Sequence, residues 1–237
     1  MFFFHIHKTG GQSVAEICSA LFPAEDCAIN QKRISVDTLK KKRFVSGHGY
    51  WSELCDSGSE VNLGGFFSFT FLRNPLDRLI SAQYHVARDP TEVSSGMIEN
   101  AIYLHRFSKL VPFDNYSQEE HFRSAMDVLI NEFYFVGISD NIGAAVSDLW
   151  SSMDIPEKYL NILKINARPQ DCSYQVPHID LECFFEKNKY DIEIFKFFNA
   201  QARGRGVNNI IKENEENYRS YINWSPADPL FGSLPLS

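Results

Sequence analysis

Two segments of the sequence carry residues that are typical of anion binding. The first follows a short apolar run and consists of Lys8, Thr9, Gly10, Gly11, Gln12 and Ser13. Its glycines let backbone N–H groups approach an anion closely, and Lys8 adds a full positive charge. In the second segment, Arg73 can bind a phosphate through two parallel hydrogen bonds, and Ser81 follows about two helical turns later. Together they predict a ligand with two separated anionic groups.

A histidine between two glycines is the candidate for proton transfer. Gly47-His48-Gly49 leaves the imidazole room to enter a cleft. The ordinary pKa of histidine, about 6.5, suits removal of a proton from a hydroxyl at neutral pH. Glu53 is the nearest rival for this role and Glu132 a more distant one, whereas we expect His5 to be structural.

The Lys8 loop, His48 and Arg73 each lie just after a predicted strand. We predict strands at residues 2–6, 43–46, 66–72 and 133–138, each rich in β-branched or aromatic residues. Helical patterns follow Gly11, begin at Pro75, and continue after Ser139-Asp140, which we expect to cap the next helix. Residues 90–130 and 187–203 also read as mostly helical. Strands alternating with helices predict one α/β domain over residues 1–237, with an irregular tail from about Trp224.

The predicted sheet explains why the candidate residues should meet. A mainly parallel sheet flanked by helices collects ligands beyond the carboxyl ends of its strands. We therefore expect the Lys8 loop, the His48 turn and the Arg73 segment to share one cleft. Asp77 and Arg78 read as an exposed helical turn, and the phenylalanines of residues 66–71 read as core. The basic run Lys40–Arg43 reads as solvated, or else as a means of attracting an anionic acceptor.

Composition excludes several classes of function. The chain has 237 residues, 20 of them phenylalanine, and a formal net charge of −7, which indicates a globular protein without general affinity for nucleic acid or anionic membranes. Its five cysteines form neither an even disulfide framework nor a zinc-binding pattern. The N-terminal apolar run is too short for a signal peptide, and no stretch is long enough to span a bilayer. We expect a cytoplasmic protein, unless an N-terminal anchor precedes this sequence.

The same segments resemble the sulfotransferases that use 3′-phosphoadenosine 5′-phosphosulfate (PAPS), in particular the carbohydrate sulfotransferases of the heparan sulfate 2-O type and their bacterial relatives. Residues 4–13 are similar to the H-I-P-K-T-G-G-T-S loop of that group, with His7 in place of proline and Gln12 in place of threonine. A turn with two histidines in that group matches Ser46-Gly47-His48-Gly49. Ser46 stands at the position of the first of these histidines. Residues 71–84 and 130–138 match later segments, and residues 163–168 lie where a loop commonly closes over the nucleotide.

The resemblance implies a P-loop-kinase-like three-layer fold and a specific division of roles. The Lys8–Ser13 loop would bind the 5′-phosphosulfate, and Arg73 and Ser81 the 3′-phosphate. Lys8 would stabilise the leaving phosphate, and His48 would act as general base toward a hydroxyl of a carbohydrate or another small acceptor. No metal would be required. The identity of the acceptor, the position of sulfation and the oligomeric state stay open.

Two other functions are compatible with a glycine loop after a strand. The first is a nucleotide-dependent kinase, which is disfavoured because Lys8 precedes both glycines and the pattern G-x-x-x-x-G-K-[ST] is absent. An obvious magnesium-binding aspartate after a strand is also missing. The second is a non-catalytic nucleotide-binding protein that keeps the fold without turnover.

Overall fold

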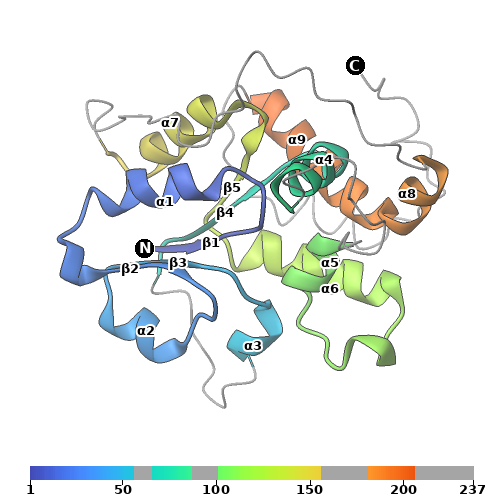
Figure 1. Cartoon of the computed structure of the whole chain (residues 1–237), viewed down its shortest axis with the longest axis horizontal. Coiled ribbons are helices and arrows are strands. Elements are labelled where there is room, and N and C mark those ends of the chain that lie inside the picture. Colours follow the sequence, from blue (N-terminus) through green and yellow to red (C-terminus); the bar gives the residue numbers. More distant parts are fainter. Residues whose placement is uncertain (56–65, 87–100, 156–180, 206–237) are drawn as a thin grey trace.

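A computed structural model of the chain describes residues 1–55, 66–86, 101–155 and 181–205. Its centre is a parallel sheet with the strand order β2-β3-β1-β4-β5 (Figure 1). The strands are β1 (Phe2–Phe4), β2 (Cys27–Gln31), β3 (Phe44–Gly47), β4 (Ser68–Leu72) and β5 (Phe135–Ile138). Since all these pairs are parallel, the carboxyl ends of the strands meet along one edge of the sheet, called the carboxyl edge below.

Helices cover both faces of the sheet, which confirms the expected three-layer α/β architecture. Helices α1 and α7 cover one face, whereas α2, α3, α5, α6 and α9 contribute to the core on the other (Figure 1). The bounds are α1 (Gly11–Ser19), α2 (Val36–Lys41), α3 (Trp51–Cys55), α4 (Pro75–Val86), α5 (Ile102–Phe107), α6 (Gln118–Asn131), α7 (Ile142–Ser152), α8 (Leu181–Lys187) and α9 (Lys189–Arg205). Short 3-10 turns occupy Ala24–Asp26, Phe113–Asn115 and Ser139–Asn141.

The central strand β1 is buried on both faces. Phe2 and Phe4 belong to the core beneath α3, α5, α6 and α9, whereas Phe3 points to the opposite core and stacks on Phe69 with ring centroids 4.8 Å apart. All three β1 side chains are fully buried. A strand covered on both faces reads as a continuous apolar run rather than an alternating one, which is the pattern at the N-terminus. The phenylalanines of β4 are also core, as predicted.

The element predictions were correct in outline but incomplete. All four predicted strands are present, but β2, α2, α3 and α8 were not predicted. Of the predicted cap Ser139-Asp140, Ser139 does not cap a helix, because its buried Oγ has no hydrogen-bond partner among the described residues and residues 139–141 form a 3-10 turn. The loop at residues 163–168 and the tail from about Trp224 lie outside the described residues. The single-domain organisation stays a prediction.

The basic run Lys40–Arg43 lies at the amino edge of the sheet, opposite the predicted cleft. The carbonyl of Arg43 accepts a hydrogen bond from the N-terminal ammonium of Met1 at 2.7 Å, and its guanidinium lies 3.7 Å from Asp26. Lys40 and Lys41 are exposed at the end of α2. The solvated interpretation fits this position, whereas attraction of an acceptor toward His48 does not.

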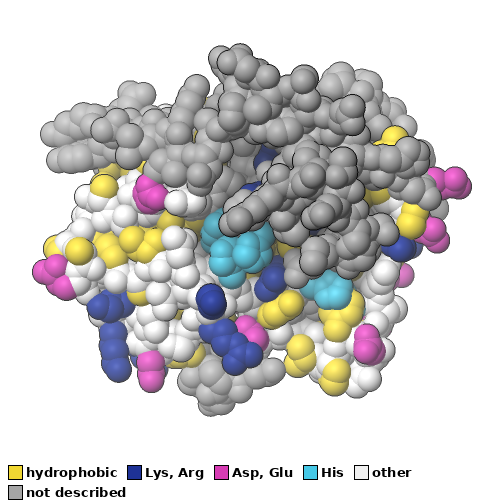
Figure 2. Space-filling model, in the orientation of Figure 1, with side chains coloured by type: hydrophobic (Ala, Val, Ile, Leu, Met, Phe, Trp, Pro, Cys, Tyr) yellow, Lys and Arg dark blue, Asp and Glu magenta, His cyan; other side chains and the backbone are white. Residues whose placement is uncertain are grey.

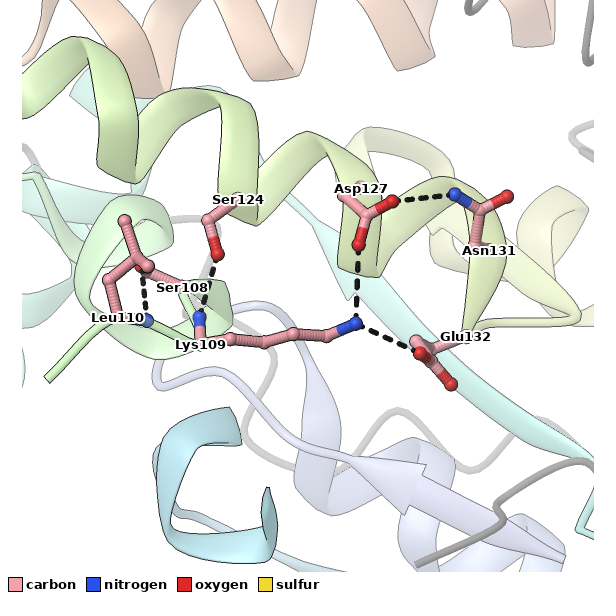
Figure 3. Close-up of polar contacts among 7 residues, drawn as sticks. All are labelled: Ser108, Lys109, Leu110, Ser124, Asp127, Asn131 and Glu132. Carbon is pink, nitrogen blue, oxygen red and sulfur yellow. Dashed lines mark hydrogen bonds and ion pairs between the residues drawn. The ribbon is translucent and has the colours of Figure 1, made fainter. Parts of the chain in front are cut away.

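A second polar cluster joins the segment after α5 to the end of α6. The ammonium of Lys109 lies 3.2 Å from Asp127 Oδ2 and 3.0 Å from Glu132 Oε1, and its backbone N–H donates to Ser124 (Figure 3). Ser68 at the start of β4 donates a hydrogen bond to the carbonyl of Glu132. Glu132 therefore lies at the amino edge of the sheet and is held by Lys109.

Helix α9 holds the start of α5 through a buried carboxylate. The fully buried Asp191 accepts hydrogen bonds from the backbone N–H groups of Tyr103 and Leu104 at 3.0–3.1 Å. Burial raises the pKa of Asp191 to about 6, although these hydrogen bonds and the charge of Arg78 act in the opposite direction. Arg78 is itself buried, so its predicted exposure is wrong. The charge of Asp191 thus compensates that of an arginine on α4.

We predict that Asp191→Ala lowers the free energy of unfolding by about 3 kcal/mol, because it removes the buried acceptor of the Tyr103 and Leu104 N–H groups and a negative charge that offsets Arg78. The matched control is Asp127→Ala, which breaks a half-exposed ion pair and should cost less than about 1 kcal/mol. Urea unfolding of both variants measures the difference. Equal losses would show that the Asp191 interactions contribute no more than a surface pair.

Candidate active site

The three segments predicted to share a cleft follow three adjacent strands. Lys8 follows the central strand β1, His48 follows β3 on one side and Arg73 follows β4 on the other. Arg73 Nη1 donates a hydrogen bond to the carbonyl of Lys8 at 3.2 Å, and the backbone N–H of His5 donates to Gly47 at 2.9 Å. The structure therefore brings the segments together at the carboxyl edge.

The shape of the Lys8–Ser13 loop is fixed by its backbone and by one buried hydroxyl. Lys8 and Gly10 have φ angles of 69° and 77°, in the left-handed region that costs a non-glycine residue energy. Thr9 is fully buried and its hydroxyl donates to the carbonyl of Ile6 at 2.9 Å. A Cβ on Gly11 would lie 1.9 Å from the His5 ring. The side chain of Thr9 thus shapes the loop, and Gly11 allows His5 to pack against it.

The other predicted anion-binding residues lie on helices that begin at the carboxyl edge. Gln12 and Ser13 lie in the first turn of α1, where the exposed Gln12 donates to Glu16 at 3.3 Å. Ser81 is half-buried within α4, whose first turn is capped by Asn74 Oδ1 accepting from the backbone N–H of Leu76 at 3.0 Å. The predicted contacts of Gln12, Ser13 and Ser81 with an anion stay predictions.

Lys8 and Arg73 concentrate positive charge at this edge. Burial lowers the pKa of Lys8, and the neighbouring charge of Arg73 lowers it further. Two cations held this close repel each other, and a bound anion would relieve that repulsion. The pair therefore favours an anionic ligand over a neutral one.

His48 is oriented by a hydrogen bond to the first strand. Its Nδ1 lies 2.8 Å from the carbonyl oxygen of His5. Since a carbonyl can only accept, Nδ1 carries the proton and Nε2 keeps the lone pair that a general base needs. Burial lowers the pKa of His48, the hydrogen bond to His5 partly offsets this, and the charge of Arg106 lowers it again. His48 is therefore neutral at pH 7.

Comparison with known proteins identifies the family. The sequence matches the sulfotransferase family over residues 1–143, about three fifths of the chain, and this region contains every predicted site residue. The chain belongs to the sulfotransferase family. A solved structure of a mouse sulfotransferase in complex with PAP (3′-phosphoadenosine 5′-phosphate) is 16% identical in sequence to this chain. Its TM-score is 0.42, and the match covers 93% of this chain and 86% of that one. No match was found among the curated proteins.

Three histidines of this sulfotransferase lie together, which the sequence analysis did not predict. The ring centroid of His48 lies 4.2 Å from that of His5 and 3.7 Å from that of His7. The structural role expected for His5 stays a prediction. Histidine side chains gather near the centre of one face, with lysine and arginine side chains beside them (Figure 2). Since alternate residues of an extended chain point the same way, the spacing of His5 and His7 was the available signal.

Two further residues near the cleft were not predicted from the sequence. The hydroxyl of the fully buried Tyr103 accepts from the backbone N–H of Arg73 at 2.9 Å and donates to the carbonyl of the same residue. Arg106 donates to the carbonyl of Gly49 at 3.3 Å, and its guanidinium lies 4.2 Å from the centre of the Tyr50 ring. Helix α5 therefore supports both the Arg73 segment and the His48 turn.

The rival bases are less well placed than His48. Glu132 lies at the opposite edge of the sheet, paired with Lys109. Glu53 is closer, but one carboxylate oxygen accepts from the backbone N–H of Tyr50 at 3.4 Å and the other lies 3.8 Å from Arg33. Ser46 is fully buried and accepts from the backbone N–H of Asn30. These positions favour His48 as the base.

The described part of the sulfotransferase contains neither a metal-binding cluster nor a membrane-spanning helix. Within residues 1–55, 66–86, 101–155 and 181–205, His, Cys, Asp and Glu side chains form no group of three or more that could hold a metal ion. In the same ranges, no helix has both the length and the apolar character to cross a membrane.

We predict that kcat/KM for PAPS rises with pH through an apparent pKa below 6.5 and is level above it, because this ratio reports the free protein, in which only neutral His48 accepts a proton and its pKa is lowered. His48→Ala should flatten this limb and reduce turnover by roughly 10²–10⁴-fold. Initial rates between pH 5 and 8 measure both, with Glu53→Gln as the control that keeps the limb. A limb that persists in His48→Ala but disappears in Glu53→Gln would assign the base to Glu53.

Proposed function

We propose that this sulfotransferase transfers the sulfuryl group of PAPS to a hydroxyl of a carbohydrate or another small acceptor, with His48 as general base. The observation that carries the proposal is the contact between the Lys8 loop and Arg73 beside a neutral histidine. Family membership supplies the reaction class. The carbohydrate acceptor is supported only by the resemblance of residues 4–13 and 46–49 to carbohydrate sulfotransferases.

PAPS offers the two separated anionic groups that the cleft favours. Its 5′-phosphosulfate would contact the Lys8–Ser13 loop, and its 3′-phosphate would contact Arg73 and Ser81. The hydrogen bond from Arg73 to the carbonyl of Lys8 does not exhaust the guanidinium, which carries five N–H donors. The same bond fixes the position of one anion-binding group relative to the other.

The residues suffice for an in-line transfer. The acceptor oxygen forms a bond to sulfur while the bond between sulfur and the bridging oxygen breaks, and the products are a sulfate ester and 3′-phosphoadenosine 5′-phosphate (PAP). Nε2 of His48 takes the acceptor proton. Lys8 stabilises the negative charge that develops on the leaving phosphate. As in phosphoryl transfer, positioning and charge stabilisation provide most of the catalysis.

We predict that the chain binds PAP about 10- to 100-fold more tightly than AMP, because Arg73 makes charge-assisted hydrogen bonds to the additional phosphate. Arg73→Ala should remove most of this preference. Isothermal titration calorimetry measures the four dissociation constants, and Arg123→Ala, which changes an exposed arginine of α6, is the control. Equal affinity of the wild-type protein for PAP and AMP would contradict the donor assignment.

We predict that Lys8→Ala lowers turnover by on the order of 10²-fold while PAP binding is partly retained, because the backbone donors of the loop remain. Transfer of labelled sulfate from PAPS to a panel of hydroxyl-bearing acceptors measures turnover. Lys41→Ala, at the amino edge, is the matched control. A change confined to the Michaelis constant for PAPS would remove the proposed transition-state role of Lys8.

A further inference from the structure

Two other imidazoles, from the segment that follows the first strand, contact the ring of His48. The His7 ring stacks on it with centroids 3.7 Å apart and planes 10° apart, and the His5 ring lies at 4.2 Å with a tilt of 37°. The centroids of His5 and His7 are only 6.3 Å apart, so the two rings do not face each other across His48. His7 covers one face of the His48 ring, whereas His5 lies toward its edge.

The hydrogen bond to His5 by itself does not fix the His48 ring. It holds Nδ1 at one point, and the ring can still tilt about that point. A flat contact over the whole ring face removes this freedom, and the His7 ring provides that contact. The tilted His5 ring contacts His48 toward its edge and leaves this face contact to His7.

We propose that His7 is a positioning residue that sets the plane of the His48 imidazole and so directs its Nε2 toward the acceptor hydroxyl. This inference rests on the proposed function, since it gives His48 the role of base. His7 directly precedes Lys8, so one short segment both holds the base and binds the donor. The geometry of this segment therefore influences the distance between the base and the sulfur.

The charged and titratable groups around His48 come from the His5–Lys8 segment, α3 and α5. Burial lowers the pKa of His5 to about 3, so this ring stays uncharged in the working pH range. The nearby cations are Lys8 on the same segment and Arg106 on α5, and Glu53 on α3 is the nearby carboxylate. Because burial is the main cause of the lowered pKa of His48, removing the His7 ring should move that pKa back toward its ordinary value.

Two substitutions separate ring stacking from other roles of His7. His7→Phe keeps an aromatic ring that cannot titrate, and we expect its turnover to stay within about twofold of the wild-type value. His7→Ala removes the ring, and we expect turnover to fall by about 10-fold or more while the affinity for PAP is unchanged. His105→Ala is the matched control, because it removes a histidine that stacks on Phe113 at 3.8 Å.

The second readout needs neither PAPS nor an acceptor. A titration of the His48 imidazole followed by NMR should show its pKa raised in His7→Ala and unchanged in His7→Phe and His105→Ala. If the wild-type protein transfers no sulfate, the proposed function fails and the titration alone decides the role of His7. An unchanged His48 titration in His7→Ala would overturn the inference, as would equal loss of turnover in both His7 variants. Weaker PAP binding in His7→Ala would also overturn it, because His7 would then act on the donor loop.

Discussion

The site depends on the parallel pairing of β1 with β3 on one side and β4 on the other. Backbone hydrogen bonds across these pairs fix where each strand ends, and Lys8, His48 and Arg73 each lie just beyond an end. The pairing is maintained by burial on both faces, since β1 contributes three fully buried phenylalanines. A slip in strand register would misplace the base and both cations together, whereas substitutions on the helices would disturb one group at a time. Precise placement of the reacting groups is therefore a property of the sheet.

Much of this fold could be predicted from the sequence because the central strands are buried on both faces and read as uninterrupted apolar runs. The edge strand β2 was missed for the opposite reason, since its residues are only half-buried and include polar side chains such as Asn30 and Gln31. The buried position of Arg78 could not be predicted either, because its charge is compensated by Asp191 on a distant helix. The alternative that Lys40–Arg43 attract an acceptor could have been excluded from the sequence. These residues precede β3, and residues that precede a parallel strand lie at its amino end.

The residue types of the candidate site could be predicted from the sequence, but the roles of several residues depend on tertiary contacts. Thr9 belongs to the anticipated anion-binding loop, yet its hydroxyl is used to hold the loop against Ile6. Ser46 stands where the carbohydrate sulfotransferases that this sequence resembles have a histidine. Its buried hydroxyl accepts a hydrogen bond from the backbone N–H of Asn30 on the neighbouring strand. The contacts of His5 and His7 with His48 require β1 and β3 to be neighbours in the sheet. The spacing of these histidines in the sequence does not establish this. Tyr103 reaches the Arg73 peptide from a helix that the sequence reading had only placed within a long helical region.

The electrostatics of the carboxyl edge favour the proposed role of His48 as base beside the proposed site for a highly charged donor. A bound polyanion raises the pKa of every neighbouring titratable group, because it favours the positively charged forms. For Lys8 this is useful, since the lowered pKa of the free site is restored and the ammonium is kept charged during transfer. For His48 it is a hazard, since a protonated imidazole cannot accept a proton. Burial and the charge of Arg106 lower the pKa of His48 in the free protein. The upward shift caused by the donor therefore begins from a lower value, which favours the neutral imidazole that the proposed base role of His48 requires.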